Sequence, residues 1–314
     1  MGTDYTVSTL VETFRRDGVV VLDSFLTRPQ IDAIRSEGEA LRERFAPDYA
    51  AKNPVKIRGG WRLDIPPVNL IRRGGASFAS ETCRFLGHPL IRSICESILG
   101  RRWFPGTLAF DYREPSETTI PRTGFKLGYP PAYFWHVDMG LPGLVHPGRF
   151  SLRFQTYLND TTLENGALGY AKGTHRLVKH VRERHKASPP ATLDENVIDS
   201  SDSLIRAAER LRAAPGGLAA EYQEILDRFK RDAPGWDHVS KEAALEYPAG
   251  SVVVFDDTGM HRGNFVQQDH RFVFRYVCNP ERPLEQLRTL KGAKNYFARQ
   301  FYRGFLAEPY RYLA

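Results

Sequence analysis

The stretch YFWHVDMG, residues 133–140, contains the pair of residues on which the interpretation of this chain depends. His136 and Asp138 are separated by one residue, and in an extended segment residues i and i+2 point to the same side. The imidazole and the carboxylate can therefore converge on one metal ion. A lone His-x-Asp pair is also common as a surface pair or a local hydrogen bond, and the pair alone does not decide between these interpretations.

A metal site needs a further ligand, and the best candidate is His261 in VVVFDDTGMHRGNF (252–265), at the end of a β-patterned run. Two imidazoles and one carboxylate form the facial triad of non-haem Fe(II) oxygenases, which leaves three positions open for co-substrate and oxygen. An arginine-bearing run, HRFVFRYV (270–277), follows directly and supports this interpretation. The alternative is that His261 is a buried, hydrogen-bonded histidine at a strand end.

The composition is that of an ordinary soluble protein, with 41% hydrophobic and 26% charged residues among 314. No apolar run is long enough for a membrane helix, and the first residues lack a signal-peptide pattern, so we expect a cytoplasmic protein. Cys83, Cys95 and Cys278 lack metal-ligand spacing and are expected to be reduced. The net charge of +7 is spread along the chain without a nucleic-acid-binding motif, which favours small anions over nucleic acid as partners.

Hydrophobic periodicity predicts a mainly helical N-terminal part, residues 1–100. Helices are expected at 6–16, at 27–45 and, broken at Gly87, at 78–100, with a strand at 19–26. Residues 46–75 are rich in Pro, Gly and Arg and are expected to form an irregular loop.

The β-pattern dominates from about residue 102 to 280, with strands expected at 102–114, 149–160, 244–257 and 270–280. A helical insertion, 177–245, interrupts it. Short strands without βαβ alternation predict a jelly-roll β-barrel and not a doubly wound sheet. We expect one domain, 1–314, ending in a tail at 281–314.

Five segments in the same order make the chain resemble the phytanoyl-CoA dioxygenase family of Fe(II)/2-oxoglutarate-dependent oxygenases, from about residue 11 to 280. They are FRRDGVVVLDSFLTRPQIDAI (14–34), FLGHPLIRSICESILG (85–100), WHVDMG (135–140), NGALGYAKGTHR (165–176) and AGSVVVFDDTGMHRGNFVQQDHRFVFRYV (249–277).

The resemblance implies a double-stranded β-helix core (jelly roll, cupin-like), mainly β with flanking helices. It implies that His136, Asp138 and His261 are the iron ligands. It also implies an arginine about ten residues beyond the distal histidine that holds the far carboxylate of 2-oxoglutarate. Arg271 has this spacing, and a guanidinium can pair with a carboxylate through two hydrogen bonds. Arg275, four residues further on the same strand face, is the rival.

Two departures from the family pattern limit what the resemblance transfers. Arg262-Gly263 follows the distal histidine, where the family often has Gly-Ser and the serine assists the co-substrate. Asn264, Thr156 and Tyr157 are the candidates to replace it. The insertion 177–245 is long for the family and could be a lid, a dimer contact or a solvated helical excursion.

The resemblance implies the use of Fe(II), 2-oxoglutarate and molecular oxygen to oxidise a C–H bond of a small metabolite or natural-product intermediate, with release of succinate and CO2. Halogenating relatives have a small residue at the position of Asp138, so a carboxylate there favours hydroxylation or another oxidation over halogenation. Scattered basic residues suggest an anionic substrate, although most could be solvated surface charges: Lys52, Lys56, Arg58, Arg62, Arg72, Arg73, Lys126 and Arg153.

Two other functions are compatible with the same residues. One is a metal-dependent cupin-type enzyme that does not use 2-oxoglutarate. The other is a non-catalytic β-barrel module that binds an anionic partner, in which the histidines and the aspartate are structural. The sequence predicts neither the prime substrate nor the oligomeric state.

Overall fold

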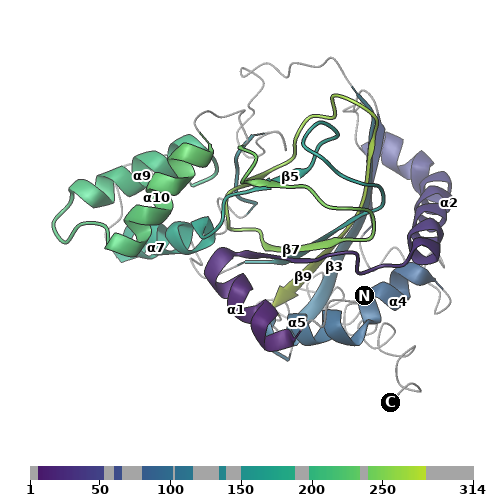
Figure 1. The fold of residues 1–314 in the computed structure, drawn as a ribbon, viewed down its shortest axis with the longest axis horizontal. Coiled ribbons are helices and arrows are strands. Elements are labelled where there is room, and N and C mark those ends of the chain that lie inside the picture. Colours follow the sequence, from purple (N-terminus) through teal and green to yellow (C-terminus); the bar gives the residue numbers. More distant parts are fainter. Residues whose placement is uncertain are drawn as a thin grey trace.

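Two antiparallel sheets lie at the centre of the structure, a computed structural model that describes residues 6–52, 60–65, 80–101, 103–115, 134–138, 150–187, 198–233 and 240–280. The larger sheet has the strand order β1-β7-β4-β9-β3-β2, and the smaller has the order β6-β5-β8. Figure 1 labels β3, β7 and β9 of the larger sheet and β5 of the smaller. The larger sheet comprises β1 (Val19–Leu22), β2 (Gly60–Ile65), β3 (Trp103–Arg113), β4 (Leu152–Tyr157), β7 (Val252–Asp256) and β9 (Arg271–Pro280). The smaller comprises β5 (Leu168–Tyr170), β6 (Ala244–Leu245) and β8 (His261–Arg262).

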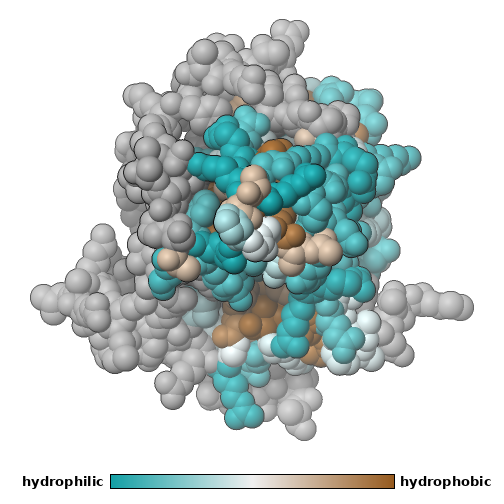
Figure 2. Space-filling view, turned by 90° about the vertical axis from the view of Figure 1, so that its left-hand side faces the viewer, coloured by the Kyte–Doolittle hydropathy of each residue, from teal (hydrophilic) through white to brown (hydrophobic). Residues whose placement is uncertain are grey.

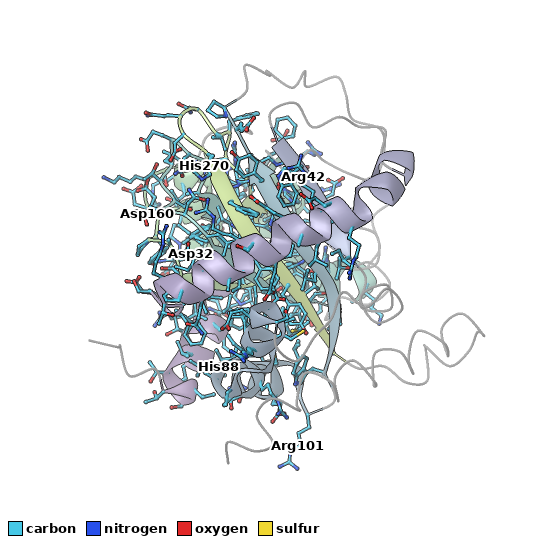
Figure 3. The ribbon with its side chains drawn as sticks, turned by 90° about the vertical axis from the view of Figure 1, so that its right-hand side faces the viewer. Asp32, Arg42, His88, Arg101, Asp160 and His270 are labelled. Atoms are coloured by element: carbon cyan, nitrogen blue, oxygen red, sulfur yellow. The ribbon has the colours of Figure 1, made fainter. Side chains whose placement is uncertain are left out.

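Helices cover one face of the larger sheet, called here the outer face. They are α1 (Val7–Asp17), α2 (Arg28–Lys52), α4 (Glu81–Gly87) and α5 (Pro89–Leu99). Figure 3 shows α2 lying across β9 and β3. Phe154 and Phe274 project from the strands into an apolar core shared with helical residues such as Ile34, Phe85 and Ile91. This burial of aromatic and aliphatic surface is the main source of stability for the outer layer.

The opposite, inner face of the larger sheet is turned toward the smaller sheet. The hydroxyl of Tyr157 on β4 donates to the carbonyl of Leu245 at 2.9 Å and accepts from the N–H of Leu168 at 3.2 Å, which joins the two sheets. A second apolar cluster, which includes Val253 and Val273, fills part of the space around it. Two facing antiparallel sheets with helices outside confirm the predicted mainly β fold with flanking helices.

Three helices form a separate lobe at one side of the molecule: α7 (Thr174–Ala187), α9 (Ser201–Ala213) and α10 (Ala220–Asp232) (Figure 1). The lobe has its own apolar core, to which Leu204 and Phe229 contribute. Its outward surface is mainly hydrophilic (Figure 2). Trp135 and Val137 belong to the same core, so the predicted insertion 177–245 packs directly against the segment that carries His136 and Asp138.

The structure departs from the predicted secondary structure in the N-terminal part. β2 lies inside the stretch expected to be an irregular loop, and β1 and β2 form the two edges of the larger sheet. Arg62 and Asp64 alternate with the buried Leu63 and Ile65, a short strand pattern that the surrounding Gly, Pro and Arg residues obscure. The break between α4 and α5 at Gly87 is as predicted.

The predicted C-terminal tail, 281–314, lies outside the described residues. Among the helices that the structure describes, none combines the length and the apolarity needed to cross a membrane.

Candidate metal centre

His136, Asp138 and His261 converge as the sequence predicted. The Nε2 atom of His136 lies 3.6 Å from Asp138 Oδ1, and the Nε2 atom of His261 lies 3.6 Å from Asp138 Oδ2. Each of the three residues offers one ligand atom, and these three atoms all lie within 4.8 Å of one another. Within the described ranges, no other set of three His, Cys, Asp or Glu residues has this geometry.

Backbone hydrogen bonds hold the two ligand-bearing segments together. His136 and His261 form an antiparallel bridge in which each N–H donates to the other residue's carbonyl at 3.0 Å. The segment that carries His136 also pairs with the start of α9. There, the N–H of Ser201 donates to the carbonyl of Trp135 at 3.2 Å. Residues about 120 positions apart in the sequence are thus placed in register by main-chain pairing.

Both histidines present the same ring nitrogen to the centre. Nδ1 of His136 lies 2.6 Å from the carbonyl oxygen of Phe134, and Nδ1 of His261 lies 2.9 Å from that of Gly259. A carbonyl only accepts, so each Nδ1 carries the proton and each Nε2 keeps its lone pair for a metal. Burial, together with the nearby His136, lowers the pKa of His261, which favours the neutral, ligating form.

Asp138 supplies the anionic ligand. Partial desolvation opposes its ionisation, but the Arg153 guanidinium and the two histidines outweigh that effect and hold the pKa of its carboxyl well below the usual range. Two imidazoles and one carboxylate that converge on one point are the donor set of a non-haem iron(II) site. The residues therefore fit an iron ion by ligand type, charge and spacing.

Arg271, the predicted co-substrate residue, is at the first position of β9 on the inner face. Only 2% of its surface is exposed, and its Nη1 donates to the carbonyl of Gly166 at 2.6 Å. The nearest carboxylate with an ion-pair contact, Asp111, is 3.7 Å from Nη2. Asn264 donates to the carbonyl of Ala167 at 2.5 Å, so it holds the turn that Arg271 also contacts.

Arg275 lies on the same face but has a close partner. Its Nη2 is 3.0 Å from Asp111 Oδ2, and the other oxygen of Asp111 is 2.5 Å from Nε of Arg113. Burial opposes ionisation of Asp111, yet Arg275, Arg113 and Arg271 together lower its pKa below the usual range. Burial in turn lowers the pKa of Arg275 to about 10, against the influence of Asp111. Asp111 is thus the buried counter-ion of an arginine group.

Thr156 does not have the position that its expected role requires. It pairs in register with Phe274 of β9 and Val252 of β7, and directly paired residues point to the same side of a sheet. Both partners belong to the outer core, so Thr156 faces the helices and not the metal centre. Tyr157, the other β4 candidate, does lie on the inner face.

Scattered basic residues were expected to favour an anionic substrate, and the structure does not describe the side chains of most of them. Arg62 is described, and it forms a two-point ion pair with Asp64 at 2.8 and 3.0 Å. The others, Arg153 excepted, lie outside the described residues: Lys52 (side chain only), Lys56, Arg58, Arg72, Arg73 and Lys126.

Sequence reasoning missed the acidic partners of the inner face. Asp111 stands in LAFDYR and Asp257 in VVVFDD, each within a strongly hydrophobic run. A charged residue at a buried strand position requires an opposite charge, and that requirement could have directed attention to Arg153 and Arg275. The identity of each partner depends on strand register, which the sequence alone does not specify.

Comparison with known proteins adds a family and a fold. A family model described as phytanoyl-CoA dioxygenase (PhyH) matches residues 14–269. A search of curated proteins found no match.

Two solved structures resemble the chain over most of its length. The non-haem alpha-ketoglutarate-dependent carbocyclase SnoK from nogalamycin biosynthesis is 16% identical, with a TM-score of 0.51 over 88% of this chain and 87% of its own. The epimerase SnoN, in complex with Fe3+, alpha ketoglutarate and nogalamycin RO, is 14% identical, with a TM-score of 0.45 over 87% and 83%. The likeness to SnoK confirms the predicted jelly-roll core.

Proposed function

The chain belongs to the phytanoyl-CoA dioxygenase family and is an oxygenase of the iron- and 2-oxoglutarate-dependent class, and from this premise we propose that it hydroxylates a small anionic metabolite or natural-product intermediate. The observation that carries the proposal is the convergence of His136, Asp138 and His261 with both Nε2 lone pairs directed to one point.

His136, Asp138 and His261 would hold the iron. The chemistry that iron supplies when bound is the coupling of 2-oxoglutarate decarboxylation by O2 to oxidation of a substrate C–H bond, with release of succinate and CO2. The protein's own contribution is to fix the tautomers of both histidines through Phe134 and Gly259 and to keep Asp138 ionised.

Arg271 would bind the far carboxylate of 2-oxoglutarate. The guanidinium is almost fully buried, and the closest carboxylate among the described residues is 3.7 Å away, so none of these forms a tight ion pair with it. An incoming carboxylate would offset that desolvation by a charge-assisted, two-point contact. Arg275 is the weaker candidate because Asp111 already pairs with it at 3.0 Å.

The anionic character of the substrate is supported by the charge of the inner face. Arg62, Arg113, Arg271 and Arg275 are accompanied on β2, β3 and β9 by two carboxylates, those of Asp64 and Asp111. This surplus of arginine favours anions, of which 2-oxoglutarate is one and the prime substrate would be another. Hydroxylation is supported by Asp138, whose carboxylate fills the coordination position that a halide would need.

Anaerobic addition of Fe(II) and 2-oxoglutarate tests the class and the ligands together. We expect a weak visible metal-to-ligand charge-transfer band, which disappears in His136→Ala and persists in the control His180→Ala. His180 lies in the lobe, where its ring stacks on Tyr222 with centroids 4.2 Å apart. Admission of O2 should then release succinate.

Folded protein that shows no band would refute the proposal. Metal binding without the band and without succinate would indicate a cupin-type enzyme that does not use 2-oxoglutarate. Absence of metal binding would indicate a non-catalytic binding module. Product analysis with a panel of anionic metabolites then separates hydroxylation from other oxidations.

A further inference from the structure

Arg153 contacts the metal-binding carboxylate from a different part of the fold. It lies in the middle of β4, with its side chain on the inner face, and its Nη2 is 2.7 Å from Asp138 Oδ2. Asp138 belongs to the segment whose His136 forms a bridge with His261 of β8. The contact therefore connects a side chain of the larger sheet to the metal centre.

Asp257, at the end of β7, fixes the position of Arg153. Its Oδ2 is 3.4 Å from Nε and 3.5 Å from Nη2 of Arg153. Its Oδ1 accepts the N–H of Ser151 at 2.7 Å, and its surface is completely buried. Arg153 therefore contacts two carboxylates. That of Asp257 is fixed to the larger sheet, and that of Asp138 faces the metal centre.

Asp257 also holds Asp138 directly. The backbone carbonyl of Asp257 accepts the N–H of Asp138 at 3.0 Å. The main chain of Asp138 is therefore positioned by the same residue that positions the guanidinium at its side chain. Such second contacts orient a ligand and tune the metal that it binds.

The two oxygens of Asp138 have different surroundings. Each lies 3.6 Å from the Nε2 atom of one histidine, Oδ1 from that of His136 and Oδ2 from that of His261, but Oδ2 is also paired with Arg153 at 2.7 Å. A six-coordinate ion held by two imidazoles and one carboxylate oxygen keeps three open positions. If both oxygens of Asp138 bound the metal, only two would remain, too few for a chelating 2-oxoglutarate and oxygen together.

We infer that Arg153, held by Asp257, is a positioning residue that keeps Asp138 bound to the metal through a single oxygen. It does so by occupying Oδ2 with a charge-assisted hydrogen bond. The inference rests on the proposed function, because it assigns Arg153 the task of preserving the coordination position that the reaction requires.

The test counts water molecules on a bound metal, which requires neither 2-oxoglutarate nor turnover. Mn(II) is bound to the wild-type protein, Arg153→Met and Arg153→Lys, and the proton relaxation of water reports the number of coordinated waters. We expect relaxivity to fall by about a third in Arg153→Met, as two open positions replace three. Arg153→Lys should restore it, because an ammonium also donates to Oδ2.

Metal and co-substrate affinities separate this role from a merely structural one. Arg153→Met removes a cation beside the metal, so Mn(II) should bind as tightly as before or more tightly. Affinity of the Fe(II)-loaded protein for 2-oxoglutarate should fall by about tenfold or more, within the usual range for outer contacts of a metal ligand. Arg176→Met, which removes an arginine paired with Glu221 in the lobe, is the control and should change neither quantity.

Unchanged relaxivity in folded Arg153→Met would overturn the inference. Should that variant fail to fold, Asp257→Asn provides the second test, since a loosened Arg153 should lower relaxivity in the same direction. If the wild-type protein binds Mn(II) with three waters but forms no charge-transfer band with Fe(II) and 2-oxoglutarate, the proposed function fails while the relaxivity comparison still decides the role of Arg153.

Discussion

The two faces of the larger sheet are made from the same strands and serve opposite purposes. On β9, Phe272, Phe274 and Tyr276 point outward into the apolar core under the helices, whereas Arg271 and Arg275 point inward. Alternation along a strand makes this division unavoidable, because every second side chain faces the other way. The outer face stabilises the fold by burying apolar surface. This stabilisation offsets the free energy that burial of charged side chains on the inner face costs.

The inner face is the energetically expensive one. Burying an arginine or an aspartate without a partner costs several kcal/mol, so each charge there requires a counter-charge. Asp111 forms ion pairs with Arg113 and Arg275, and Arg153 forms ion pairs with Asp138 and Asp257. Arg271 is the exception, because the closest carboxylate in the part of the chain that the structure describes is 3.7 Å away. On this face, the charge with the poorest pairing is therefore the one that we propose to bind the co-substrate.

Removal of Phe274 should show the largest effect, and only on stability. Its ring is fully buried and lies 5.2 and 5.6 Å, centroid to centroid, from those of Phe110 and Phe85. We expect Phe274→Ala to lower the free energy of unfolding by about 3–5 kcal/mol, measured by urea denaturation. The folded fraction should bind 2-oxoglutarate with unchanged affinity, and a large loss of that affinity would mean that the two faces are not independent.

Removal of Arg271 should have the next largest effect, and chiefly on binding. Loss of one partner of a buried charge pair costs about 2–5 kcal/mol, so the Kd of the Fe(II)-loaded protein for 2-oxoglutarate should rise at least about 30-fold in Arg271→Ala. Iron binding should be retained. Arg275→Ala is the matched variant and should lower stability more than co-substrate affinity, because it leaves Asp111 with one close partner fewer. The reverse result would make Arg275 the co-substrate residue.

Replacement of Thr156 should have the smallest effect. Its buried hydroxyl faces the outer core and has no hydrogen-bond partner among the described residues. Thr156→Val exchanges this unsatisfied group for a methyl of similar size, so unfolding free energy should stay the same or rise by about 1 kcal/mol. The Kd for 2-oxoglutarate, measured by the same titration, should not change. A tenfold rise would place Thr156 at the co-substrate after all.

Local patterns in the sequence were sufficient for several parts of the fold and the site. The break at Gly87, the helices of the lobe and the β-patterned runs depend on residue types within a few positions. The His-x-Asp spacing predicted a shared direction for His136 and Asp138, because period two is a property of any extended segment. The strand at Gly60–Ile65 was missed because six residues amid Gly, Pro and Arg carry too short a pattern.

The function of the lobe was also beyond sequence reasoning. Its helical periodicity was clear, but whether it formed a lid, a dimer contact or a solvated excursion remained open. Trp135 and Val137 lie within the apolar core of the lobe, so the insertion packs against the segment that carries His136 and Asp138. That contact joins residues far apart in the chain, and no local pattern records it.

The sequence alone was enough to infer the family, the alternation of strand faces and the three residues that converge at the candidate metal centre. The three-dimensional arrangement was needed to show that Arg153 reaches Asp138, that Asp111 pairs with Arg275, and that Thr156 faces away from the metal centre. The physical reason is register: a strand pattern says which residues share a face, but which charge meets which depends on how strands pair, and a shift of one residue would exchange every partner.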